Sequence, residues 1–371
     1  ENYPNVPLLF NLIGACYKAL GQLEGSAQMY KVAVRIKPDY VEAHNNLGNI
    51  FKDLNQLDDA VKSYKRAIVV KPDYAEAHNN LGNALKDLNQ LDDAVKSYKK
   101  AIVVKPDFAE AHNNLGNAFK DLNQLDDAVK SYSKAININQ TFSEAYYNLG
   151  VVLKLLRQVD DAVGAYKNAI IIKPNFAEAH NNLGSCFTVL GQMIEAIGYY
   201  EKAIKIRPNF AEAHKNLGFN LLSLGKVEGA ARCFEKALAI NPDYAEAHSN
   251  LGHIYKKLKQ SDKARLSYER AYKIKPKMDF ILGDVLNNKM HLSDWFDLGN
   301  LLDEVKKKIV VSEKVISPFF LLGLIDNPGL QRKAAEIYSL KKHTKSYALA
   351  DITPYPKHKK IRIGYFSSDF K

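Results

Sequence analysis

Apolar residues follow helical spacing along most of the chain, and the pattern returns every 34 residues. Within residues 75–108, Leu81 and Leu85 lie four positions apart, and Tyr98 and Ile102 repeat that spacing further along. Residues with this spacing share one face of a helix. Each 34-residue unit therefore predicts two antiparallel helices with an apolar seam between them.

Several residue types keep the same period and mark the ends and the interior of each unit. The prolines are Pro38, Pro72, Pro106, Pro174, Pro208, Pro242 and Pro276, with Gln140 at the remaining unit end. The glycines are Gly48, Gly82, Gly116, Gly150, Gly184, Gly218 and Gly252, and the aromatic residues are Tyr64, Tyr98, Tyr132, Tyr166, Tyr200, Phe234 and Tyr268. This period is typical of a solenoid, in which each unit stacks on its neighbours. Eight units span about residues 7–278.

Local signals predict the helix boundaries inside the unit 75–108. Asp73 and Glu76 have the spacing of a capping box, so the first helix is expected to start near residue 75. Asn89 stands where other units have glycine, and we expect a left-handed residue there that ends the first helix. The second helix is predicted from about Leu91.

Small residues at Gly82, Ala94 and Ala101 allow the two helices of a unit to approach closely. With the leucine–glycine pair, the aromatic residue and the closing proline, they make the unit resemble a tetratricopeptide repeat. The resemblance implies an all-α fold. It would be a superhelical solenoid of about eight helix-turn-helix units, with the first helices lining a concave groove.

Two rows of asparagine fall on the first helices of the units. The first asparagine row stands one position before the leucine–glycine pair and comprises Asn46, Asn80, Asn114, Asn148, Asn182, Asn216 and Asn250. The second asparagine row stands three residues later and comprises Asn49, Asn83 and Asn117, followed in later units by Val151, Ser185, Phe219 and His253. Residues three apart share a helical face, so both rows are expected to face the groove.

An asparagine amide offers hydrogen-bond donors and an acceptor together. These groups match the backbone amides of an extended peptide, whatever side chains the peptide carries. Both rows are therefore predicted to bind extended or flexible protein segments in the groove. The alternative is that the asparagines form hydrogen bonds between repeats, and the two roles are compatible.

Charge and composition narrow the classes of partner. The chain has 52 Lys and Arg against 41 Asp and Glu, a net charge of +11, but the two signs are interleaved. A nucleic-acid partner would need basic or aromatic residues where the first row has asparagine, so none is expected. No apolar run has the length of a membrane span, and no membrane partner is expected. The cysteines Cys16, Cys186 and Cys233 form no disulfide framework and are predicted to fill the core of a cytoplasmic protein.

Histidines recur at one position of the period, at His44, His78, His112, His180, His214 and His248. Each lies about one repeat from the next, which is too far to share a metal ion, so a packing role is predicted. No phosphate-binding loop, nucleophile elbow or zinc motif occurs. We therefore predict no catalytic, cofactor-binding or metal-binding residue in this chain.

The period is lost after residue 278. Residues 291–309 have helical spacing and contain Trp295, which is expected to pack where the solenoid ends. Residues 316–339 predict a buried turn, a break at Pro328 and another helix from about Gly329.

The last residues change character again. A proline-rich and lysine-rich linker precedes residues 361–366, whose alternating pattern predicts one orphan β-strand with nothing after it to pair with. The sequence thus predicts three parts: the solenoid at 1–278, a helical connector at 279–351, and a linker with the first strand of a further domain at 352–371.

Three features of the carboxy-terminal part resemble one family. Asp294-Trp295, Ser317-Pro318-Phe319 and the terminal IRIGYFSSDF, following an asparagine-lined repeat array, are similar to the O-linked N-acetylglucosamine transferases and their Spindly-like relatives. The resemblance implies that residues 352–371 begin a truncated glycosyltransferase domain. Its donor would be UDP-N-acetylglucosamine or another nucleotide sugar, and its acceptors would be Ser or Thr of proteins.

On this interpretation the chain is the substrate-recruiting arm of a protein glycosyltransferase and is itself non-catalytic. The alternative is a non-enzymatic tetratricopeptide scaffold for protein–protein interaction. The length of the protein beyond Lys371 discriminates between them, because the transferase needs several hundred further residues. A homodimer through the convex face of the array is compatible with either interpretation.

Overall fold

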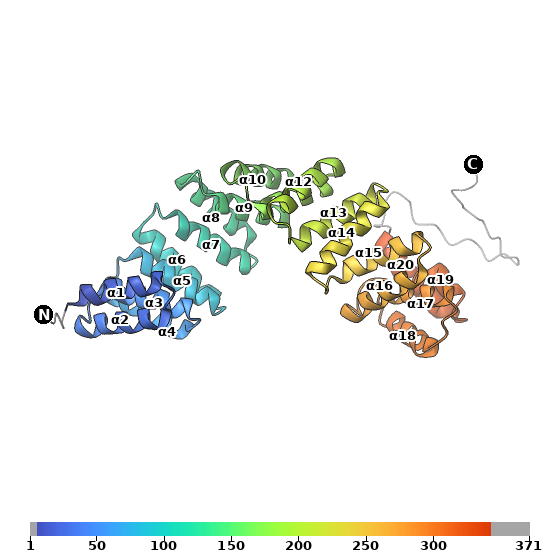
Figure 1. Ribbon diagram of the computed structural model, residues 1–371, viewed down its shortest axis with the longest axis horizontal. Coiled ribbons are helices and arrows are strands. Elements are labelled where there is room, and N and C mark those ends of the chain that lie inside the picture. Colours follow the sequence, from blue (N-terminus) through green and yellow to red (C-terminus); the bar gives the residue numbers. More distant parts are fainter. Residues whose placement is uncertain (1–5, 343–371) are drawn as a thin grey trace, which may run out of the picture. The chain divides into compact units, whose positions relative to one another are not determined.

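The computed structural model describes residues 6–342, which are helical and contain no strand (Figure 1). The chain divides into two compact units, Glu1–Pro242 and Asp243–Lys371. The all-α solenoid prediction is confirmed for the described residues. The predicted linker and strand at 352–371 lie outside them, and the predicted boundaries at 278 and 351 stay predictions.

The first unit contains seven pairs of helices. They are α1 (Pro7–Ala19), α2 (Leu23–Ile36), α3 (Val41–Asp53), α4 (Leu57–Val70), α5 (Ala75–Asp87), α6 (Leu91–Val104), α7 (Ala109–Asp121), α8 (Leu125–Ile138), α9 (Ser143–Leu155), α10 (Val159–Ile172), α11 (Ala177–Val189), α12 (Met193–Ile206), α13 (Ala211–Ser223) and α14 (Val227–Ile240). Within a pair the first helix packs on the second, and the second also contacts the first helix of the next pair. Consecutive first helices from α3 to α13 also touch, so they form a continuous surface.

Each pair turns through one residue with positive φ, as the sequence predicted for Asn89. Asn55, Asn89 and Asn123 have φ of 58°, 59° and 58°. Glycine takes this role at Gly21, Gly191 and Gly225. Arg157 adopts the same conformation with φ of 63°, although a long side chain disfavours it and the sequence did not single it out.

The predicted capping box at Asp73 and Glu76 is wrong. Helix α5 begins at Ala75 and α6 at Leu91, as predicted, but no side chain caps the first turn of α5. The chain enters the helix through a backbone turn, in which the N–H of Tyr74 donates to the carbonyl of Lys71. The side chain of Glu76 lies 3.9 Å from the lysine at the end of the next helix, Lys105, instead of reaching back.

The predicted seam of the unit 75–108 is confirmed. Leu81, Leu85 and Tyr98 are buried, and Ile102 packs half-buried against the same cluster. The Tyr98 ring lies directly against Gly82, where no side chain separates α5 from α6. This contact recurs in every described repeat, which explains why glycine and an aromatic residue share one period.

Core filling is confirmed for Cys186, which is fully buried, but it is wrong for Cys16, which is exposed, and Cys233 is half-buried. One period after Cys16 stands Ile50, which is completely buried. Cys16 differs because α1 is the first described helix, and no described helix precedes it to cover that position.

The second unit contains the last helix pair and the connector. Its helices are α15 (Ala245–Lys257), α16 (Ser261–Ile274), α17 (Ile281–His291), α18 (Leu298–Val310), α19 (Pro318–Leu322) and α20 (Pro328–Lys342). One side of α17 packs on α16 through Ile281 and Val285, and its other side joins Val305 and Ile309 of α18. The connector thus covers the last repeat with a further helix. The predicted break at Pro328 is confirmed as the start of α20.

The prediction that Trp295 packs where the solenoid ends is wrong, because 60% of its side chain is exposed. Ile281 and Val285 of α17 take that covering position. Trp295 lies instead in the turn before α18, which starts only at Leu298. In this turn the carboxylate of Asp294 accepts hydrogen bonds from Lys289 and from the backbone of Phe296.

Candidate functional site

The first asparagine row occupies equivalent positions on successive first helices, and every member is half-buried. In the first unit, each Nδ2 group donates to the residue 35 positions earlier, at 3.0 to 3.1 Å. The pairs are Asn46 to Asn11, Asn80 to Asn45, Asn114 to Asn79, Asn148 to Asn113, Asn182 to the hydroxyl of Tyr147, and Asn216 to Asn181. The row therefore links neighbouring repeats.

The acceptors of these bonds form a row that the sequence analysis missed. Asn45, Asn79, Asn113 and Asn181 stand one position before the first asparagine row and are buried. Their period was visible in the sequence, but a position with asparagine, tyrosine, lysine and serine in different units gives no sign of a shared role. The structure thus confirms, for the Nδ2 groups of the first row, the alternative that these asparagines form hydrogen bonds between repeats.

An asparagine amide that donates one hydrogen bond still has a second N–H donor and its oxygen acceptor. Among residues 6–342, no further hydrogen bond of the side-chain amide is formed by Asn46, Asn80, Asn114, Asn148 or Asn216, and each of these side chains is partly exposed. Asn250, in the second unit, lines a cavity of ≈ 420 Å³ together with Glu246, Ser249 and Lys275. The first row can therefore still bind a ligand while it holds the repeats together.

The second asparagine row has a different role. The Oδ1 atoms of Asn49, Asn83 and Asn117 accept hydrogen bonds of 2.7 to 2.8 Å from the hydroxyls of Tyr64, Tyr98 and Tyr132. Burial raises the pKa of these phenols, so each stays a neutral donor. One lone pair of each asparagine oxygen is thereby engaged inside its own repeat.

The tyrosine contact also accounts for two breaks in the second row, Phe219 and His253. Phe219 lies in the repeat whose aromatic residue is Phe234, which has no hydroxyl to satisfy. In the second unit, His253 Nδ1 is within hydrogen-bond distance of the Tyr268 hydroxyl, at 3.0 Å. Only the repeat with Val151 leaves its tyrosine hydroxyl, that of Tyr166, buried without a partner among the described residues.

The recurring histidines bind backbone rather than metal. Nε2 of each of five histidines donates to the proline carbonyl six residues earlier at 2.9 to 3.1 Å, and the residues are His44, His78, His112, His180 and His214. The bond fixes the turn that enters each first helix. Within residues 6–342, no group of three or more His, Cys, Asp or Glu side chains is placed to hold a metal ion.

These histidines predict a pH dependence of stability. Burial lowers the pKa of His44, His112 and His180 below the usual value of about 6.5, because it disfavours the charged ring. The unfolded chain therefore binds protons at higher pH than the folded chain does. The contribution of these histidines to the free energy of unfolding should be constant above pH 7 and should fall as the pH decreases from about 7 to 5.

Urea unfolding at several pH values measures this effect. The variant H44Q/H112Q/H180Q keeps neutral donors at the three positions and should show a flatter profile over that range. An identical slope in the variant and the parent would contradict the prediction.

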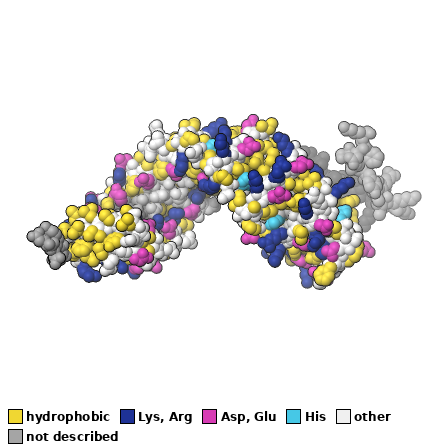
Figure 2. All heavy atoms as spheres, in the orientation of Figure 1, with side chains coloured by type: hydrophobic (Ala, Val, Ile, Leu, Met, Phe, Trp, Pro, Cys, Tyr) yellow, Lys and Arg dark blue, Asp and Glu magenta, His cyan; other side chains and the backbone are white. Residues whose placement is uncertain are grey.

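The charged surface contains no region of one sign on the face shown in Figure 2, where basic and acidic side chains are interleaved. Lys18, Lys52 and Lys86 pair with an aspartate of the next repeat, at 3.2 to 3.9 Å. In the described part of the chain, no helix is both long enough and apolar enough to cross a membrane.

Comparison with known proteins identifies the repeats. The family model described as TPR repeat matches residues 14–55, 48–89, 82–122, 116–156 and 220–259, and the model described as Tetratricopeptide repeat matches 177–210 and 245–278. No curated protein matches the chain.

Parts of the chain are also similar to solved structures. A structure of MamA is 30% identical over 45% of this chain and 97% of its own, with a TM-score of 0.42. YrrB, described as a TPR protein with an unusual peptide-binding site, is 26% identical over 50% of this chain and 96% of its own, with a TM-score of 0.44. A chain of the APC/C hetero-tetramer Cut9-Hcn1 is 15% identical over 72% of this chain and 52% of its own, with a TM-score of 0.54, and it shares the fold alone. The chain therefore belongs to the tetratricopeptide-repeat family of protein-binding scaffolds.

Proposed function

We propose that the first asparagine row binds the backbone of extended protein segments. The observation that carries the proposal is the unused half of each amide, an Oδ1 acceptor and one N–H, repeated on adjoining first helices. Helices in contact lie about 10 Å apart, which three residues of an extended chain span at roughly 3.3 Å each. A peptide could thus meet one asparagine at every third residue.

The second asparagine row contributes less to this binding. One lone pair of each Oδ1 atom already accepts from tyrosine, so Asn49, Asn83 and Asn117 have less acceptor capacity left for peptide N–H groups than the first row has. We expect their removal to affect repeat stability more than peptide affinity.

The test is the variant N80A/N114A/N148A, assayed with extended Ser/Thr-rich peptides by fluorescence anisotropy. Three lost peptide contacts should weaken binding about tenfold or more. The variant also loses three inter-repeat hydrogen bonds, so the matched control is N45A/N79A/N113A, which removes the acceptors of the same three bonds.

The two variants separate binding from stability. Both should unfold at lower urea concentration, but only the first-row variant should lose affinity. Equal affinities for the two variants would show that the first row is purely structural.

A narrower form of the proposal makes this chain the substrate-recruiting arm of a protein O-N-acetylglucosamine transferase. It is supported by the resemblance of Asp294-Trp295, Ser317-Pro318-Phe319 and residues 361–370, whereas the matching family models describe repeats only. The test is transfer of labelled sugar from UDP-N-acetylglucosamine to protein by the full-length protein. Label on Ser or Thr would support the transferase, and inactivity would leave a scaffold.

A further inference from the structure

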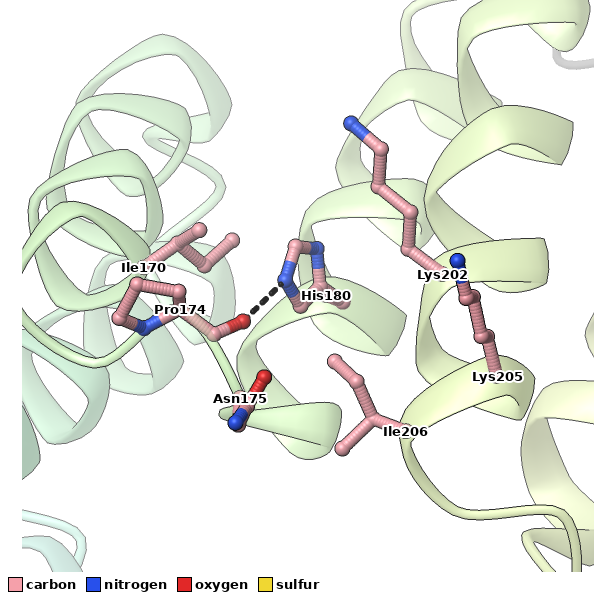
Figure 3. A pocket seen from close by; sticks show the side chains of 7 residues that line it. All are labelled: Ile170, Pro174, Asn175, His180, Lys202, Lys205 and Ile206. Carbon is pink, nitrogen blue, oxygen red and sulfur yellow. Dashed lines mark hydrogen bonds between the residues drawn. The ribbon is translucent and has the colours of Figure 1, made fainter.

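Two cavities lie at consecutive repeat junctions of the first unit. The first has a volume of ≈ 620 Å³ and lies between the end of α10, the turn into α11, and α12 (Figure 3). Pro174 and Ile170 form one side, Lys202, Lys205 and Ile206 face them from α12, and His180 stands between. The second has a volume of ≈ 350 Å³ and is lined in the same way one repeat later, with Lys236 on α14. Neither lining contains an acidic residue.

At both cavities an asparagine stands where several other repeats have an acid. The residue after the closing proline is Asn175 at the first cavity and Asn209 at the second, whereas four other repeats have aspartate there, at Asp39, Asp73, Asp107 and Asp243. In the second unit, Asp243 lies 3.7 Å from Arg270, which occupies the position of Lys202 and Lys236. Lys202 and Lys236 therefore carry the same basic charge as Arg270, but the residue opposite them is asparagine instead of aspartate.

Neighbouring acids do not compensate for this loss. Glu178 is hydrogen-bonded to Arg207, and Glu144 to Lys173. Lys202 lies over the ring of Tyr199, with its Nζ 5.0 Å from the ring centroid. Lys205 has no ion-pair partner among residues 6–342. The cavities therefore combine apolar walls with lysines, Lys202, Lys205 and Lys236, that form no ion pair within 4 Å among residues 6–342.

We propose that these two cavities bind carboxylates of an extended acidic segment of a partner protein. Lys202 and Lys205 would attract one carboxylate and Lys236 the next, while Ile170, Pro174 and Ile206 contact the aliphatic stems of glutamates. The two sites are one repeat apart, which is about 10 Å and corresponds to three residues of extended chain. A single small anion could occupy only one cavity, so the pair of sites favours a peptide.

The test uses a labelled peptide with glutamate at every third position in a glycine–serine background, followed by fluorescence anisotropy at low ionic strength. The same peptide with glutamine should bind more weakly by about fivefold or more, because it keeps only the backbone contacts of the first asparagine row. The variant N175D/N209D restores the acid that other repeats have, so it should fold normally and weaken binding by about fivefold. The charge-matched control Q56E/Q90E adds the same two charges at exposed turn residues, and its affinity should equal that of the parent.

Three results would overturn the proposal: equal affinity of N175D/N209D and the parent, equal weakening by Q56E/Q90E, or equal affinity of the parent for the glutamate and glutamine peptides. The first result would show that the cavities are not the site, and the second would show attraction to the net positive charge of the whole chain. Failure here would leave the proposal for the first asparagine row standing, because N80A/N114A/N148A lies in other repeats and should weaken binding of the glutamate and glutamine peptides by the same factor.

Discussion

Replacement of Gly82 by alanine is expected to lower the free energy of unfolding by about 2 to 3 kcal/mol. A Cβ at this position would lie 2.5 Å from Cε1 of Tyr98 and 2.7 Å from Cδ1. The Tyr98 ring is fully buried between helices, so it cannot move aside without displacing α5 from α6. The helix propensity that alanine adds, about 1 kcal/mol, offsets only part of this cost.

The matched control is Gly164→Ala in α10, where nothing lies within 4 Å of the added Cβ. This substitution should stabilise the chain by about 0.5 to 1 kcal/mol through helix propensity alone. Gly218→Ala should fall between the two, because the nearest atom there is Cε1 of Phe234 at 3.1 Å.

Urea unfolding and amide exchange in the substituted repeat measure the local effect, since long repeat arrays need not unfold in one step. A stabilising Gly82→Ala would refute the close-approach argument.

The second large effect concerns the tyrosine hydroxyls. Tyr98→Phe removes a 2.7 Å bond and leaves Asn83 Oδ1 without its donor, so it should destabilise by about 1 to 2 kcal/mol. Tyr166→Phe should be neutral or stabilising, because the Tyr166 hydroxyl is buried without a partner among the described residues. The nearby amide of Asn182 donates to Tyr147 instead.

A third variant tests the cause of this difference. Val151→Asn introduces the asparagine that stands fifteen positions before the tyrosine in other repeats. Its Oδ1 should accept a hydrogen bond from the Tyr166 hydroxyl and raise the free energy of unfolding by about 1 kcal/mol. In that background Tyr166→Phe should become destabilising. If Tyr98→Phe and Tyr166→Phe cost the same, the asparagine acceptor contributes nothing.

Much of the fold followed from period and local chemistry. The helix starts at Ala75 and Leu91 and the left-handed turn at Asn89 were predictable, because contacts within a helix pair join residues close in sequence. The glycine–tyrosine contact was predictable in outline, since both residues recur in every unit. The errors at Cys16 and Trp295 have different causes: no described helix precedes α1 to cover Cys16, and α17 already covers the last repeat, so Trp295 stays exposed in the turn before α18.

The candidate site was predicted less completely. The first asparagine row was predicted, but its hydrogen-bond partners Asn45, Asn79 and Asn113 were not. The second row was predicted to bind peptide, whereas its oxygens accept hydrogen bonds from the tyrosines.

The sequence by itself determined the period, the two helices of each unit, and the presence of an unbroken asparagine row, because these depend on local propensity and on spacing along one helix. Only the tertiary structure decided which amide groups are engaged and where the cavities beside Lys202 and Lys236 lie. The physical reason is that a side chain 35 positions away becomes a partner only through the angle and the distance at which one repeat stacks on the next.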